Sequence, residues 1–195
     1  MSVLYLVISS LLLGMLVGKY TSLEFGNLYE FMLYLLIFVI GIDIGKSRGL
    51  REELKRLGKM AILLPTSTVV GSLMGGLLAS FLLKVSPKWG LAISAGFGWY
   101  SLTGPLLANY SPVYGIIGFL ANLTREILTI IFYPLAIKRI PKEKAIVMGG
   151  ATTMDTTLPL MVKFGGTEIT LLAFVHGFIL TAIAPFLIPL ILQLL

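Results

Sequence analysis

Two carboxyl groups lie in the middle of long apolar runs. Glu126 is about 13 residues into the run 113–137, and Asp155 is near the centre of the run 145–162. A charge at the centre of a bilayer costs about 2.5–3.5 kcal/mol on insertion scales, so such groups usually face a cavity or a partner. A carboxyl group in a low-dielectric site also favours its neutral form and can exchange a proton. We therefore expect Glu126 and Asp155 to be proton or cation sites.

Two other polar residues lie beside Glu126 in the same run. Asn122 is one helical turn earlier and on the same face, where it either extends a polar stripe or forms an interhelical hydrogen bond. Arg125 is adjacent in sequence but about 100° around the helix, so it would meet Asp155 or the carboxylate of a solute. The alternative for all the charged residues is a structural ion pair.

Two short blocks combine glycine with hydroxyl residues. They are AGFGWYSLTGP at residues 95–105 and GGATTMDTTLP at residues 149–159. Non-helical backbone at membrane depth occurs only where protein buries it or where it lines a water-filled cavity. The blocks therefore predict two helix breaks that present backbone groups and hydroxyls to a solute, with helix packing through small residues as the alternative. The hydroxyl residues are Ser101, Thr103, Thr152, Thr153, Thr156 and Thr157.

Four more side chains are candidates for the same site. Trp99 and Tyr100 lie within the first block, where their rings would stack on a cationic solute. His176 lies after the second block, where it would relay protons near neutral pH or simply be hydrogen-bonded. Asp43 precedes a basic loop, where it would pair with a basic residue at the membrane interface.

The composition excludes a soluble globule. Apolar residues make up 57% of the 195 and charged residues 12%, whereas soluble domains average about 25% charged. A bilayer core of roughly 30 Å needs about 20 apolar residues for each helical span. The first run has no basic residue before it and no clear cleavage site, so we expect a retained helix. The apolar runs are Val3–Gly18, Leu28–Gly45, Met60–Leu83, Trp89–Ala108, Val113–Ile137, Ala145–Val162 and Ile169–Leu195.

Enzymatic and nucleic-acid functions find no support in the residues. The chain has no cysteine, and we find no zinc-ligand spacing, nucleotide-binding loop or nucleophile triad. We therefore expect no enzyme, cofactor or metal site. The net charge of +6 resides in short loops between apolar runs, which fits membrane topology better than a nucleic-acid surface.

The basic loops predict the topology. Residues 46–59 and 138–144 are rich in lysine and arginine, so both should be cytoplasmic. Both loops lie on the same side only if one apolar run between them enters and leaves by the same face. The run 89–108 is the better candidate because Gly96, Gly98, Gly104 and Pro105 interrupt it. Each arm of such a re-entrant hairpin would reach about 15 Å, half the hydrocarbon thickness.

A weak internal repeat extends this topology. An offset of 54 residues aligns Gly96 with Gly150 and Ser101 with Asp155, which indicates an inverted repeat of hairpin-plus-helix units at 84–137 and 138–191. We predict an all-α integral membrane protein with about five transmembrane helices and two re-entrant hairpins. The N-terminus would be cytoplasmic and the C-terminus outside. The expected organisation is one membrane transport domain, 1–195, comprising a three-helix part at 1–83 and hairpin-helix units at 84–137 and 138–195.

Composition and spacing alone indicate a transporter of a small polar solute in the cell membrane. Four blocks then add a family resemblance, with a weaker echo in FVIGIDIG before the first basic loop. Through them the chain resembles the prokaryotic lysine exporter family over most of its length. The blocks are GFGWYSLTGPLL at 96–107, NLTREILTI at 122–130, GGATTMDTTLP at 149–159 and VHGFIL at 175–180.

The resemblance implies outward movement of lysine and analogues such as thialysine in exchange for protons. It places the family's intramembrane glutamate on Glu126 and the aspartate of its T-[TS]-M-D block on Asp155. Longer members carry extra N-terminal helices with a further acidic residue, for which Asp43 would be the substitute. A homodimer or a separate membrane partner would supply the missing scaffold. The alternatives are exchange of another cation, such as Na⁺ for H⁺, a channel, and a non-transporting assembly subunit.

Overall fold

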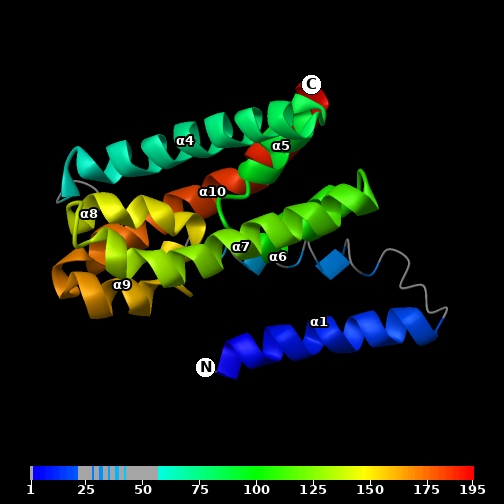
Figure 1. Cartoon of the computed structure of the whole chain (residues 1–195), viewed down its shortest axis with the longest axis horizontal. Coiled ribbons are helices and arrows are strands. Elements are labelled where there is room, and N and C mark those ends of the chain that lie inside the picture. Colours follow the sequence, from blue (N-terminus) through cyan, green and yellow to red (C-terminus); the bar gives the residue numbers. More distant parts are fainter. Residues whose placement is uncertain are drawn as a thin grey trace.

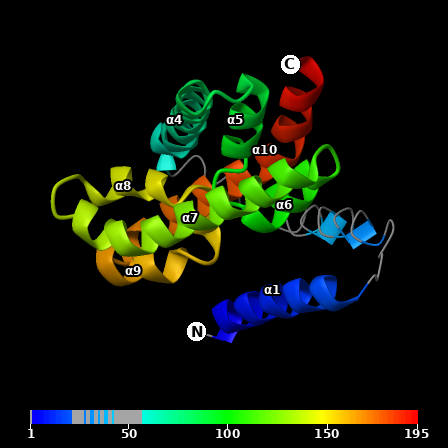
Figure 2. The same ribbon diagram turned by 45° about the vertical axis from the view of Figure 1, so that its right-hand side comes forward.

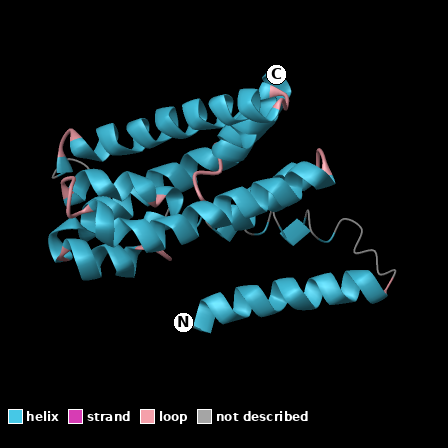
Figure 3. Ribbon diagram, in the orientation of Figure 1, coloured by secondary structure: helices cyan, strands magenta, loops and turns pink. Residues whose placement is uncertain are grey.

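The computed structural model describes residues 2–21, 28, 31, 32, 35, 38, 39, 42 and 57–195. Every regular element in these parts of the chain is helical (Figures 1 and 3). The predicted all-α class is therefore confirmed. The elements are α1 (Ser2–Tyr20), α4 (Met60–Leu83), α5 (Pro87–Ser94), α6 (Tyr100–Ala108), α7 (Pro112–Ala136), α8 (Lys142–Ala145), the 3₁₀ turns η1 (Ile146–Met148) and η2 (Gly150–Met154), α9 (Leu158–Gly165), the turn η3 (Thr167–Ile169) and α10 (Thr170–Leu194).

Three described helices are long and apolar enough to cross a membrane. They are α4, α7 and α10, with 24, 25 and 25 residues, and each would extend about 36 Å or more. In Figure 1, α10 passes between α4 and α7. Protein buries 56% of the most apolar window of α10, but only 22% of that of α4 and 28% of that of α7. Helix α10 is thus the central element, and the other two present apolar faces outward.

The first predicted break is present between α5 and α6. Helix α5 begins at Pro87 and ends at Ser94. Phe97 and Gly98 follow with positive φ angles of 51° and 95°, a backbone region that a right-handed helix cannot continue through. Helix α6 then begins at Tyr100 and packs along α7. The arms have 8 and 9 residues, or about 12–14 Å each, close to the arm length predicted for a half-membrane hairpin.

The second break is less regular than the first. In place of a helical arm, α8 has only 4 residues and is followed by η1 and η2. Threonine hydroxyls explain the 3₁₀ geometry, because Thr152 donates to the Gly149 carbonyl at 2.8 Å and Thr153 donates to the Gly150 carbonyl at 2.9 Å. Such local bonds compete with the helical pattern. Helix α9 restores regular structure after this segment.

Two apolar clusters lie along opposite ends of α10. One joins its C-terminal half to α5, α6 and η2, and the other joins its N-terminal half to α4, α7, η1 and α9. Figure 2 shows both broken segments gathered around α10. The first cluster consists of Ala92, Ala95, Phe97, Leu102, Leu106, Leu107, Ala151, Leu180, Ala184 and Ile188.

Candidate functional site

The two helix breaks touch each other through main-chain atoms. The backbone N–H of Ala151 donates to the Phe97 carbonyl at 2.9 Å. A Cβ added to Gly98 would lie 3.4 Å from the Gly149 carbonyl oxygen, and one added to Gly150 would overlap the Phe97 carbonyl. The approach therefore requires glycine at position 150, and the φ of 95° favours glycine at position 98. Segments more than 50 residues apart form one structural unit.

Asn122 of α7 supports the first break. Its side-chain oxygen accepts the N–H of Gly98 at 2.6 Å, and its amide nitrogen donates to the carbonyls of Ile93 at 3.0 Å and Gly118 at 2.9 Å. The side chain is 4% exposed, so no water replaces these bonds. Of its two predicted roles, the structure shows an inter-element hydrogen bond to the turn.

Replacing Asn122 with alanine should destabilise the protein by about 2–4 kcal/mol, because the Gly98 N–H and the Ile93 carbonyl would be buried without partners. Thermal unfolding of the purified chain in detergent measures the loss. Asn109, which is exposed at the end of α6, provides the control. Equal stability of the Asn122→Ala and Asn109→Ala proteins would contradict the supporting role.

The two predicted carboxyl groups lie in one region. Glu126 is 7% exposed, and within the described part of the chain its Oε2 atom has no hydrogen-bond partner. The Thr156 side chain lies within hydrogen-bonding reach of this carboxyl group, and the Asp155 charge acts on it. Tyr100, at the start of α6, lies within electrostatic range of both carboxyl groups. The structure thus assembles residues from both breaks and from α7.

Asp155 borders a cavity between the breaks. The backbone N–H of Thr156 donates to its Oδ1 atom at 2.5 Å, and the residue is exposed, whereas Glu126 is buried. The cavity has a volume of about 260 Å³, below the roughly 300–1,000 Å³ of sites for drug-sized ligands, and suits a small solute. Its lining residues are Trp99, Ser101, Ala151, Thr152, Met154, Asp155 and Thr181.

The hydroxyl residues divide into cavity-lining and structural groups. Ser101 lines the cavity and accepts the indole N–H of Trp99 at 3.1 Å. Thr152 also lines it, although its hydroxyl already contacts that of Thr157 at 3.1 Å. Thr103 is fully buried and donates to the Trp99 carbonyl at 2.7 Å, so it stabilises the turn and does not line this cavity.

His176 is fully buried between α4 and the second break. Its Nε2 atom lies 2.8 Å from the Thr68 hydroxyl and its Nδ1 atom lies 3.0 Å from the Thr153 hydroxyl. Both ring nitrogens are therefore occupied. Of the two predicted roles, the geometry matches a hydrogen-bonded structural histidine that joins α4, α10 and η2.

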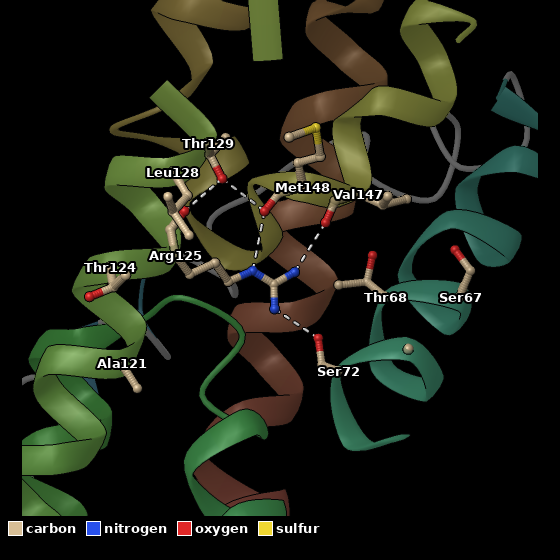
Figure 4. Close-up of a pocket in the computed structure, with 11 residues that line it drawn as sticks. Ser67, Thr68, Ser72, Ala121, Thr124, Arg125, Leu128, Thr129, Val147 and Met148 are labelled. Carbon is tan, nitrogen blue, oxygen red and sulfur yellow. Dashed lines mark hydrogen bonds between the residues drawn. The ribbon is translucent and has the colours of Figure 1, made fainter. Parts of the chain in front are cut away.

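Arg125 occupies a second, larger cavity between α4 and α7 (Figure 4). Its Nε atom donates to the Met148 carbonyl at 3.2 Å and its Nη2 atom to the Val147 carbonyl at 3.1 Å. Its Nη1 atom donates to the Ser72 hydroxyl at 2.7 Å. None of these acceptors is a carboxylate, so these bonds go to η1 and α4 and not to Asp155. The cavity volume is about 530 Å³.

The contact between the breaks lies between the two cavities. Val147 and Met148 line the Arg125 cavity, whereas Ala151 and Thr152 line the Asp155 cavity. Gly149 and Gly150 lie between these pairs, and a Cβ added to Gly150 would lie 3.2 Å from the Arg125 Cζ atom and would overlap the Phe97 carbonyl. Consecutive parts of one segment, 147–152, therefore line both cavities.

Sequence reasoning missed some lining residues, and one candidate is not described. Ser72 and Thr68 contact Arg125 and His176, and Thr181 lines the Asp155 cavity. Polar residues at mid-span in apolar helices were the available signal. Asp43, most of the predicted span 28–45 and most of the loop 46–59 lie outside the described residues.

Comparison with known proteins identifies the family. The model of the family described as lysine exporter LysO matches residues 6–192 of the chain. The chain belongs to this lysine exporter family. It is 39% identical over 160 residues to the lysine exporter LysO of Escherichia coli (strain K12), and this match covers 82% of the chain and 53% of that relative. The chain thus spans about half the length of the Escherichia coli protein.

A second relative matches the chain over nearly the whole length of both proteins. The chain is 36% identical over 184 residues to a Haemophilus influenzae protein named "Putative lysine exporter", covering 93% of the chain and 92% of that protein. No solved structure matches the chain. Family membership and three long apolar helices establish a membrane protein of a transporter family.

Proposed function

We propose that this chain exports L-lysine across the cell membrane in exchange for protons. The observation that carries the proposal is the convergence of Glu126 and Asp155 at the meeting point of two helix breaks. Two carboxylates there offer a site for one cation, and the small cavity beside Asp155 accommodates a solute. The names of the relatives supply lysine as the expected solute.

The geometry suggests how binding and release alternate. With both carboxyl groups ionised, a lysine ammonium group would enter past exposed Asp155 and reach buried Glu126. The Trp99 ring and the polar atoms of Ser101 and Thr152 would hold the rest of the solute. Protonation of the carboxyl groups from outside would remove the attraction and release the cation. Thialysine, which keeps the same charged groups, would follow the same route.

The membrane arrangement is part of the proposal. Helices α4, α7 and α10 span the bilayer, whereas α5–α6 and α8–α9 enter and leave by the same face as an inverted pair of hairpins. The runs 3–18 and 28–45 would add two spans before α4, and the basic loop between α7 and α8 would be cytoplasmic, so the N-terminus would lie inside and the C-terminus outside. A second copy or a separate membrane protein completes the scaffold.

Lysine flux in proteoliposomes that contain only this chain tests the proposal. An imposed pH gradient should drive uptake or release of labelled lysine, with thialysine as a competitor. Because the chain has no cysteine, Lys138→Cys gives a single labelling site that reports orientation in the vesicles. Flux of Na⁺ without lysine would instead establish a cation exchanger. Absence of any flux from folded protein would favour an assembly subunit.

A further inference from the structure

The Arg125 guanidinium retains hydrogen-bonding capacity toward its cavity. A guanidinium has five N–H groups in a fixed fork. Nε, Nη1 and Nη2 each donate one hydrogen bond to protein, which leaves one N–H on each terminal nitrogen. Two N–H groups on different guanidinium nitrogens can bind a carboxylate bidentately. Within the described residues the guanidinium forms no ion pair with a carboxylate, so its charge is available to a ligand.

The surroundings hold the guanidinium in place. Ser72 comes from α4 and the two carbonyl acceptors come from η1, so Arg125 links three elements. Thr129 reinforces this arrangement, because its hydroxyl contacts both the Arg125 carbonyl and the Met148 carbonyl at 2.9 Å. Figure 4 shows the guanidinium between α7 and α4, in the space lined by Thr68 and Ser72. A fork fixed in this way is preorganised for a planar anion.

The depth of the cavity indicates where its ligand comes from. Ser72 and Arg125 lie near the middle of helices with 24 and 25 residues, about 15–20 Å from either helix end. Lipid phosphates lie outside a hydrocarbon core of about 30 Å and would not reach this position. The ligand at this depth is therefore a small anion that enters from water, such as a carboxylate.

We propose that Arg125 binds the α-carboxylate of the transported amino acid and thereby excludes diamines that lack this group. This inference rests on the proposed function. Glu126 is the next residue on α7, so one helix presents a cation site and an anion site at adjacent positions. Arg125 also packs against Gly150 at the contact between the breaks. A solute with both an ammonium and a carboxylate group can engage the two sites together.

Binding of lysine, lysinamide and 1,5-diaminopentane to the purified full-length chain tests the inference by titration calorimetry. Wild-type protein should bind lysine at least about tenfold more tightly than the two compounds without a carboxylate. Arg125→Gln should weaken lysine binding by at least about tenfold and leave lysinamide binding unchanged. Equal wild-type affinities for lysine and lysinamide would overturn the inference while leaving the proposed function intact.

A cavity-filling variant covers the case in which Arg125→Gln does not fold. Gly71 lines the Arg125 cavity, and a Cβ added there meets nothing within 4 Å. Gly71→Leu should therefore reproduce the selective loss of lysine affinity. Gly14 on α1 is equally open and lines neither of the cavities that Arg125 borders, so Gly14→Leu should match wild type. Unchanged lysine binding in Gly71→Leu would contradict the site, and a wild-type chain that binds none of the three compounds would contradict the proposed function itself.

Discussion

Replacing Glu126 with glutamine should reduce proton-driven lysine flux by at least about 100-fold, with no loss of folded protein. Removing one partner of a buried charge pair typically costs about 3–5 kcal/mol, which corresponds to roughly 100-fold or more in affinity. Glutamine has nearly the same shape as protonated glutamate, so packing is retained. Within the described residues the Oε2 atom of Glu126 has no hydrogen-bond partner, so replacing the carboxyl group with an amide disrupts few hydrogen bonds.

The measurement is labelled-lysine flux in proteoliposomes, with thermal unfolding in detergent run in parallel. Glu143→Gln makes the same change on α8, at a residue that lines neither the Asp155 nor the Arg125 cavity, and should leave flux at the wild-type level. Flux in Glu126→Gln above about one fifth of wild type would show that Glu126 is not the cation site. Loss of flux together with loss of folded protein would point to a structural role.

Replacing Gly150 with alanine should abolish transport and destabilise the contact between the breaks. Gly150 has a φ of 64°, where a residue with a side chain pays about 1–2 kcal/mol, and an added Cβ would overlap the Phe97 carbonyl. The hydrogen bond from Ala151 to Phe97 cannot form once that carbonyl moves. We expect a loss of at least about 3 kcal/mol in unfolding free energy, measured by thermal unfolding, and flux at background.

Two further glycine variants make the prediction quantitative. Gly75→Ala adds the same methyl group where nothing lies within 4 Å, so stability should not fall. Gly98→Ala should be intermediate, because its Cβ would lie 3.4 Å from the Gly149 carbonyl oxygen at a φ of 95°. Equal stability of Gly150→Ala and Gly75→Ala would exclude a required main-chain contact.

The long helices were predictable because apolar length and proline positions define them. The predicted runs 60–83, 113–137 and 169–195 differ from α4, α7 and α10 by one residue or less at each end. The break near Gly96 and Gly98 was also predictable, since two glycines precede a polar turn. The 3₁₀ geometry of the second break was not, because it depends on which carbonyls the threonine hydroxyls select.

The candidate site was predictable in its residue types but not in its pairings. Their position in the middle of apolar runs marks Glu126 and Asp155 as candidates, but it does not show that Thr156 and Tyr100 lie beside them. The sequence suggested Asp155 or a solute carboxylate as the partner of Arg125. In the structure, three hydrogen bonds from its guanidinium go to η1 and α4. Main-chain acceptors leave no signature in a sequence, so only the folded chain reveals them.

The main-chain contact between the two breaks bears on the speed of movement through the protein. Side-chain rotamers change within picoseconds to nanoseconds, whereas displacement of packed helices takes microseconds to milliseconds. A transport step that separates the two breaks would part the hydrogen bond between Ala151 and Phe97 and move the helices that flank it. Such a step is collective, so turnover should be slow and strongly dependent on temperature, unlike flow through an open pore.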